Sequence, residues 1–157
     1  MNPIARRILQ LLGSTLIQAL ILFLSAWSLK WLEGWLYVGI YALLLIMASL
    51  VMIPSGKIEV IAERSKVKED AKRWDKWLTR IITIPSLGAL VLAGLDERFH
   101  WQPDFGLPAQ VVGGILYVLG YLVVLWAMYT NQYFSSVVRI QKERGHVAVT
   151  GGPYRYV

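Results

Sequence analysis

The amino-acid sequence predicts an all-α membrane protein with four transmembrane helices, a cytoplasmic amphipathic helix, and both termini in the cytoplasm. Four long stretches contain no charged residue. Hydrophobic residues make up 56% of the 157 positions, which is more than soluble domains usually contain. The lysines and arginines are concentrated in alternate connections between the apolar stretches. At this length we expect a single membrane domain over residues 1–157.

The first two apolar stretches each have the length of a membrane-spanning helix. Residues 8–29 contain 22 positions without a charge, and a spanning helix needs about 20 apolar residues. This run is too long for the core of a cleavable signal peptide, and no small-residue cleavage site follows it, so we expect it to stay as the first span. Residues 34–54 form the second expected span, because Pro54 and Gly56 disfavour further helix.

The connection after the second span changes character. Residues 57–80 contain eight Lys or Arg and five Asp or Glu. Apolar side chains nevertheless recur there at helical spacing and leave one face apolar: Val60, Val67, Trp74, Trp77, Leu78 and Ile81. The pattern predicts an amphipathic helix in the cytoplasmic loop 55–77, lying on the membrane surface or packed beneath the spans. A solvated helical connector is the alternative.

The third span is expected over residues 78–95, although its uncharged core is short. Only 15 residues separate Arg80 from Asp96. At about 1.5 Å per residue they cover about 22 Å, less than a hydrocarbon core of about 30 Å. The span is completed if the Arg80 side chain snorkels and the helix begins near Trp77. A re-entrant segment is the alternative.

The fourth span is expected over residues 109–130, and its helix is expected to continue further. From Tyr129 the sequence becomes polar but keeps its helical periodicity, and Gly145 is a suitable cap. Two pairs of small residues suit the close approach of another helix. These pairs are Ala89 and Ala93 in the third span, and Gly113 and Gly120 in the fourth.

The positive charges predict the orientation of the spans. Fourteen of the sixteen Lys and Arg residues lie at the N-terminus, around the middle loop or in the C-terminal segment, and the other two connections carry only Lys30 and Arg98. By the positive-inside rule, both termini and the middle loop face the cytoplasm. The net charge of +6 is therefore a topology signal that also favours anionic lipid heads. No soluble face interleaves basic and aromatic residues, so no nucleic-acid partner is expected.

Most enzyme and metal chemistry has no signature in this sequence. The chain contains no cysteine, which excludes disulfides and thiolate metal sites. The two histidines, His100 and His146, fall on opposite sides of the membrane in the predicted topology, so no shared metal is expected. The sequence has no glycine-rich dinucleotide fingerprint, no phosphate loop and no spacing typical of a catalytic triad.

The C-terminal stretch GHVAVTGGPYRYV is the best candidate for a binding site. Thr150 and Pro153 suit the cap and the first position of a helix, whose N-terminus favours an anion. The rings of Tyr154 and Tyr156 suit a cation or a flat heterocycle. His146, just before a strand-like apolar triplet, adds a switchable donor or acceptor. A ligand with an anionic end, a cationic centre and an aromatic ring fits these groups; a plain turn with interfacial tyrosines is the alternative.

The C-terminal sequence NQYFSSVVRIQKERGHVAVTGGPYRYV resembles the start of the cofactor-binding region of the isoprenylcysteine carboxyl methyltransferase family. The related phospholipid methyltransferases are similar. The family pattern is a His, a short apolar strand, a Thr or Ser, and then Gly-Pro-Tyr. The stretch ERSKVKEDAKRWDKW also looks like the cytoplasmic loop of bacterial members. Members of this family are integral membrane enzymes that use S-adenosylmethionine.

The resemblance implies that a cofactor-binding region starts within residues 139–157. Five residues fall on family positions that line the cofactor: His146, Val147, Ala148, Val149 and Tyr154. Gly152 and Pro153 are expected to shape the turn, and Arg139 falls where some members have a cofactor-contacting Gln. No catalytic residue is assigned. The family pattern continues with Arg-His-Pro, further membrane helices and an Arg/Glu pair, so we expect a truncated sequence that is not active alone.

The resemblance implies S-adenosylmethionine-dependent methyl transfer to a lipid-linked carboxylate or another membrane substrate. The cofactor would enter from the cytoplasm, and the lipid substrate laterally between helices. A carboxylate acceptor is already ionised at neutral pH, whereas an amine acceptor needs a nearby base, and no candidate base stands out. Two alternatives stay open: a membrane lipid or sterol reductase with a nicotinamide cofactor, and a small non-enzymatic membrane subunit.

Overall fold

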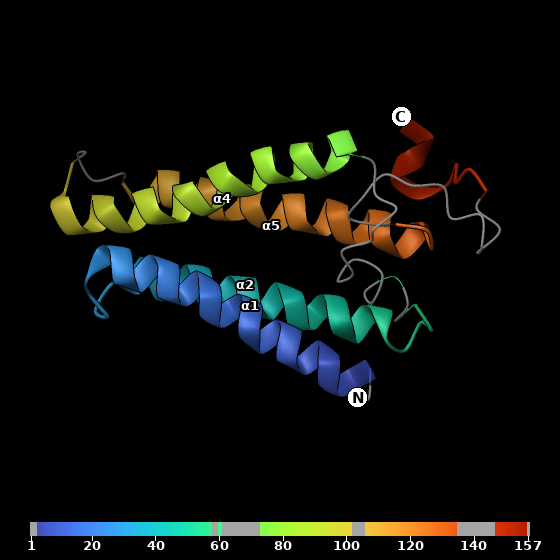
Figure 1. Cartoon of the computed structure of the whole chain (residues 1–157), viewed down its shortest axis with the longest axis horizontal. Helices are drawn as coiled ribbons and strands as arrows, with labels where there is room; N and C mark the ends of the chain where they lie inside the picture. The colour runs from blue at the N-terminus through green and yellow to red at the C-terminus, as the bar shows by residue number, and fades with distance from the viewer. Residues whose placement is uncertain (1–2, 58–59, 61–72, 102–105, 135–146, 157) are drawn as a thin grey trace. The chain divides into compact units, whose positions relative to one another are not determined.

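The computed structural model describes most of the chain, in the following ranges: 3–57, 60, 73–101, 106–134 and 147–156. These residues form four long helices and one short 3-10 helix, and no strand occurs among them (Figure 1). The elements are α1 (Pro3–Ala26), α2 (Leu32–Met52), α4 (Arg73–Phe99), α5 (Leu107–Thr130) and η2 (Gly152–Tyr156). The predicted all-α class is confirmed for the described residues.

Three of these helices are long and apolar enough to cross a membrane. They comprise Arg7–Ala26 of α1, all of α2 and all of α5. At about 1.5 Å per residue each is about 30 Å long or longer, which matches the hydrocarbon core of a bilayer. Many of their large apolar side chains are exposed, for example Leu12, Leu43 and Leu116. Helices that are apolar all round are typical of a membrane protein.

α4 is longer than the predicted third span, 78–95. It begins at Arg73, inside the stretch predicted as a surface helix, and continues without a break to Phe99. Its first and last turns contain the charged residues Asp75 and Arg98, and it is not among the three apolar helices found in the described residues. Most of the predicted amphipathic helix lies outside the described residues.

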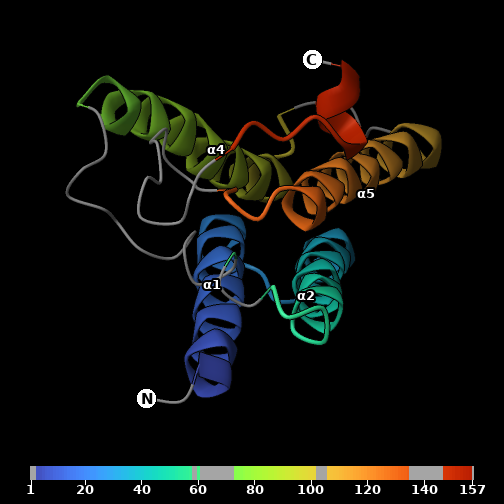
Figure 2. The same cartoon turned by 90° about the vertical axis from the view of Figure 1, so that its right-hand side faces the viewer.

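The contacts fall into two compact units, and α2, α4 and α5 each pass from one unit into the other. Unit 1 contains Met1–Ile46 and Arg80–Gly113, and unit 2 contains Met47–Thr79 and Gly114–Val157. In unit 1, α1 and the first part of α2 form a hairpin whose two helices lie side by side (Figure 2). The hairpin core consists of Leu22, Phe23 and Val38.

Polar and aromatic contacts join the two helices of this hairpin. The Tyr37 hydroxyl donates a hydrogen bond to Oε1 of Gln18 at 2.6 Å. The ring of Phe23 lies 4.6 Å from the ring of Trp35, measured between centroids. A half-buried donor and acceptor that satisfy each other avoid the cost of a lone polar group in an apolar environment.

α4 contacts α1 through a close approach of the two backbones at Gly94, which is buried. A Cβ atom at Gly94 would overlap Oγ of Ser25 and lie 2.7 Å from the carbonyl oxygen of Leu22. Such an approach is possible only for a residue without a side chain. The predicted pair Ala89 and Ala93 is exposed instead, so the prediction chose the right helix but the wrong residues.

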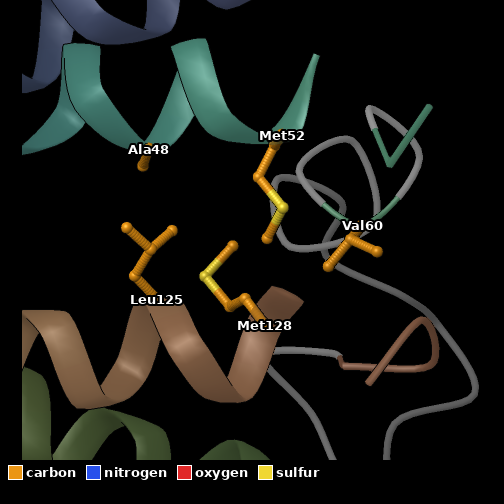
Figure 3. Packing of buried hydrophobic residues seen from close by; sticks show 5 residues of the cluster. All are labelled: Ala48, Met52, Val60, Leu125 and Met128. Carbon is orange, nitrogen blue, oxygen red and sulfur yellow. The ribbon is translucent and has the colours of Figure 1, made fainter. Parts of the chain in front are cut away.

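The predicted close packing at Gly113 and Gly120 is not formed within the described part of the chain. A Cβ atom at either position would meet no described atom within 4 Å, apart from its own helix and neighbours. In unit 2 the end of α2 instead faces α5 through larger side chains, with Val60 beside them (Figure 3). This cluster contains Ala48, Met52, Val60, Leu125 and Met128.

α5 ends at Thr130, although the sequence predicted that its helix continues. The side-chain oxygen of Asn131 accepts a hydrogen bond from the backbone N–H of Tyr133 at 2.9 Å. This local bond competes with helical hydrogen bonding and favours a turn. The predicted continuation is therefore wrong at residues 131–134, and residues 135–146, with the predicted cap, lie outside the described residues.

Candidate functional site

The C-terminal motif forms a tight turn followed by the 3-10 helix η2. Gly152 has a φ of 58°, a left-handed conformation that favours glycine. The backbone N–H of Tyr154 donates a hydrogen bond to the carbonyl of Gly151 at 3.2 Å, which closes the turn. The predicted helix after the turn is therefore present, but it has only five residues. A helix this short has a small dipole, which weakens the physical basis of the predicted anion preference.

The turn packs against the last residue of α5. A Cβ atom at Gly152 would overlap the Thr130 hydroxyl and lie 2.9 Å from its Cγ2 methyl group. In Figure 1 and Figure 2, η2 lies beside the end of α5. The two glycines differ here, because a Cβ atom at Gly151 would make only an ordinary contact of 3.7 Å with the same methyl group. Position 152 therefore favours glycine for two reasons: its backbone is left-handed, and it lies very close to the Thr130 side chain.

The residues predicted to line a cofactor are partly accessible. Val147 and Ala148 are exposed, whereas Val149 and Tyr154 are half-buried. The three residues Val147–Val149 form neither helix nor strand, so the triplet that looked strand-like in the sequence is not a strand. His146 lies outside the described residues, as does Arg139. Within the described part of the chain, no hydrogen bond or ring contact joins Tyr154 to Val147–Val149.

A lysine that the sequence interpretation did not single out lies at the same end of α5. The Nζ atom of Lys57 is 3.5 Å from the centroid of the Tyr129 ring, and it also donates a hydrogen bond to the Tyr129 backbone carbonyl. This carbonyl belongs to the last turn of α5, where helical partners are missing and a cation is favourable. Lys57 therefore caps α5, next to the residue against which Gly152 packs.

The turn combines several kinds of groups that can contact a ligand. Among the described residues, no group of three His, Cys, Asp or Glu side chains could hold a metal ion. The turn offers backbone N–H groups, the half-buried ring of Tyr154, the exposed guanidinium of Arg155 and the apolar side chains of Val147 and Ala148. These groups suit a ligand that combines an anion, a cation and an apolar ring.

The described residues define a helical protein with three helices able to cross a membrane and a C-terminal turn that packs on the end of one of them. No family model, curated protein or solved structure matches the chain. The resemblance to the isoprenylcysteine carboxyl methyltransferase family therefore stays a prediction from the sequence motif.

Proposed function

We propose that this chain is part of a membrane enzyme that transfers a methyl group from S-adenosylmethionine to a lipid-linked acceptor. The supporting observation is the close packing of Gly152 on Thr130. This contact fixes the Gly-Pro-Tyr turn at the end of an apolar helix, where a soluble cofactor and a lipid could both reach it. The sequence motif supplies the cofactor class, and the packing supplies a reason for the glycine in the motif.

The proposal includes four spans with both termini in the cytoplasm, as the positive-inside rule predicts. This requires α4 to be the third span. Its 27 residues give about 40 Å at about 1.5 Å per residue, enough for a bilayer core. Exposed Trp74 and Trp77 lie near its start. At its other end, its last residue, Phe99, stacks on Trp101 with ring centroids 5.6 Å apart. Aromatic residues at both ends are typical of the two membrane interfaces.

The described residues of the turn fit the chemical groups of S-adenosylmethionine. The ring of Tyr154 suits the positive sulfonium, and the guanidinium of Arg155 or the turn N–H groups suit the carboxylate. The apolar side chains of Val147 and Ala148 suit the adenine ring. We assign Val147, Ala148, Val149 and Tyr154 to the cofactor site, together with His146 from the sequence motif.

The cofactor, when bound, supplies an electrophilic methyl group. A carboxylate acceptor is ionised at neutral pH, so the protein needs no strong base and contributes mainly by aligning the reactants and excluding water. In this scheme Tyr154 holds the cofactor, while Gly152 and Thr130 keep the turn in place. The membrane helices deliver a lipid-linked acceptor laterally.

Calorimetric titration of the purified full chain in detergent with S-adenosylmethionine tests the proposal. We expect binding by the wild-type chain and about tenfold weaker binding by the Tyr154→Ala variant, because a ring that stacks on a base or contacts a cation contributes about 1–2 kcal/mol. Tyr154→Phe keeps the ring and should bind like the wild type. Equal affinity of all three proteins would contradict the assignment of Tyr154.

A parallel titration with a reduced nicotinamide dinucleotide separates the proposal from a membrane reductase. We expect no binding of this dinucleotide. Binding of the dinucleotide in place of S-adenosylmethionine would overturn the proposal in favour of the reductase, and binding of neither would favour a non-enzymatic subunit.

A further inference from the structure

The backbone of Lys57 is fixed by the way α2 ends. Gly56 has a φ of 69°, a left-handed conformation that favours glycine. The backbone N–H of Gly56 donates a hydrogen bond to the carbonyl of Ile53 at 3.2 Å. The N–H of Lys57 donates to the carbonyl of Met52 at 3.0 Å. Two such bonds around a left-handed glycine form a Schellman motif, which closes a helix at its C-terminus. Lys57 therefore belongs to the closed end of α2.

The side chain of Lys57 makes two contacts with one residue of α5. Its Nζ atom lies 3.5 Å from the centroid of the Tyr129 ring and donates a hydrogen bond to the Tyr129 backbone carbonyl. Carbonyls in the last turn of a helix lack helical partners and favour a cation. The hydrogen bond from the N–H of Asn131 to the carbonyl of Ala127, at 2.9 Å, belongs to the same turn. Lys57 therefore joins the end of α2 to the last turn of α5.

The next residue of α5, Thr130, contacts the C-terminal turn. A Cβ atom at Gly152 would overlap the hydroxyl of Thr130, so the backbone of the turn lies directly on this side chain. The turn itself is closed by the N–H of Tyr154, which donates to the carbonyl of Gly151 at 3.2 Å. All these residues belong to unit 2. Two consecutive residues of α5 therefore connect Lys57 to the candidate binding turn.

We propose that Lys57 is a positioning residue for the candidate binding turn. It orders the last turn of α5, and the ordered Thr130 side chain keeps Gly152 in place. The alternative is that the apolar cluster around Met52 and Met128 orders this end of α5 alone. Methionine side chains are adaptable, whereas the hydrogen bond from Lys57 is directional and acts next to Thr130. The proposal concerns how the turn is held and not what it binds, so it does not depend on the proposed methyl transfer.

Amide hydrogen exchange of the full chain in detergent, followed by NMR, tests the proposal without a ligand. The two reporters are the N–H of Asn131 in the last turn of α5 and the N–H of Tyr154 in the C-terminal turn, whose exchange reports local opening. We expect Lys57→Met to speed exchange about fivefold at both amides, which corresponds to the loss of about 1 kcal/mol for a capping cation above a ring. Lys57→Arg keeps both contacts and should exchange like the wild type. Lys30→Met removes a lysine from unit 1 and should also leave both rates unchanged.

The two reporters distinguish positioning of the turn from simple helix capping. If Lys57 only caps α5, Lys57→Met speeds exchange at Asn131 and leaves Tyr154 at the wild-type rate, and this result would overturn the proposal, as would unchanged rates at both amides. The second test repeats the change in a Gly152→Ala background, where the added methyl group releases the turn from Thr130. Lys57→Met should then no longer affect the Tyr154 rate. An undiminished fivefold effect in this background would show that the lysine acts on the turn by another route, and the proposal would be wrong.

Discussion

The two contact units hold their helices together by different means. In unit 1, α4 approaches α1 at Gly94 so closely that no side chain fits between the backbones, and the hairpin contains a hydrogen bond between Tyr37 and Gln18. In unit 2, the end of α2 and α5 meet through flexible Met52 and Met128. Shape and polar pairing specify the contacts in unit 1, whereas adaptable side chains fill the contact in unit 2.

This difference predicts where the chain tolerates change. A backbone contact leaves no room for adjustment, so a single added methyl group must displace a helix. A methionine cluster can rearrange around a substitution at small cost. Unit 2 also contains the candidate binding turn, so we expect the rigid contacts to lie in unit 1 and the adaptable ones in the unit that contains the candidate site. Four variants test this contrast.

The largest effect is expected from Gly94→Ala in unit 1. The new methyl group would overlap Ser25 and crowd the Leu22 carbonyl, and overpacking of this kind typically costs about 1–3 kcal/mol. We expect a loss of about 3 kcal/mol in the free energy of unfolding, measured by denaturant titration in detergent.

Gly88→Ala is the matched control on the same helix, because a Cβ atom there meets no described atom outside its own helix within 4 Å. It should be neutral or stabilise α4 by up to about 1 kcal/mol, the usual helix-propensity gain. Similar behaviour of the two variants would show that α4 does not pack on α1 at Gly94.

A smaller and local effect is expected from Gly152→Ala in unit 2. Alanine is disfavoured at a φ of 58° by about 1–2 kcal/mol, and its methyl group would also collide with Thr130. We expect faster trypsin cleavage after Arg155 with little change in global unfolding. Gly151→Ala should cleave at the wild-type rate, since its added methyl group makes only a 3.7 Å contact.

Lys57→Met tests the cap of α5 and should have a still smaller effect. Methionine keeps the apolar stem but removes the cation above the Tyr129 ring and the donor to its carbonyl. We expect a loss of about 1 kcal/mol in the free energy of unfolding. Lys57→Arg keeps both interactions and should retain most of the stability; equal losses in both variants would contradict the capping role.

The centres of the helices could be predicted from the sequence, but their ends could not. Long uncharged runs are sufficient to locate α1, α2 and α5, because few other structures accommodate them. The end of α1 depends instead on Trp27, which takes a left-handed conformation at φ 55°. Tryptophan has no general preference for such a cap, so no sequence signal places it there.

The turn of the candidate site could be predicted from its sequence motif, but its contacts with the end of α5 could not. Gly-Gly-Pro-Tyr predicts a turn, because glycine and proline restrict the backbone in known ways. The contacts that hold this turn are remote in sequence, between Gly152 and Thr130, and the cap of α5 joins Lys57 and Tyr129, which are 72 positions apart. In the charge pattern, Lys57 is only one of many cations in the loop. Its contact with Tyr129 depends on tertiary packing, which the sequence does not reveal.

The smallest effect is expected from a variant that tests whether polar pairing, as well as close packing, stabilises unit 1. Tyr37→Phe removes the 2.6 Å hydrogen bond to Gln18, and hydrogen bonds between membrane helices contribute about 0.6 kcal/mol on average. Since Tyr37 makes other contacts, a double-mutant cycle with Gln18→Leu isolates the pair. A coupling energy near 0.6 kcal/mol would show that the hydrogen bond stabilises the hairpin. A coupling of zero would mean that close packing alone stabilises it, and unit 1 would then differ from unit 2 only in the size of its interfacial side chains.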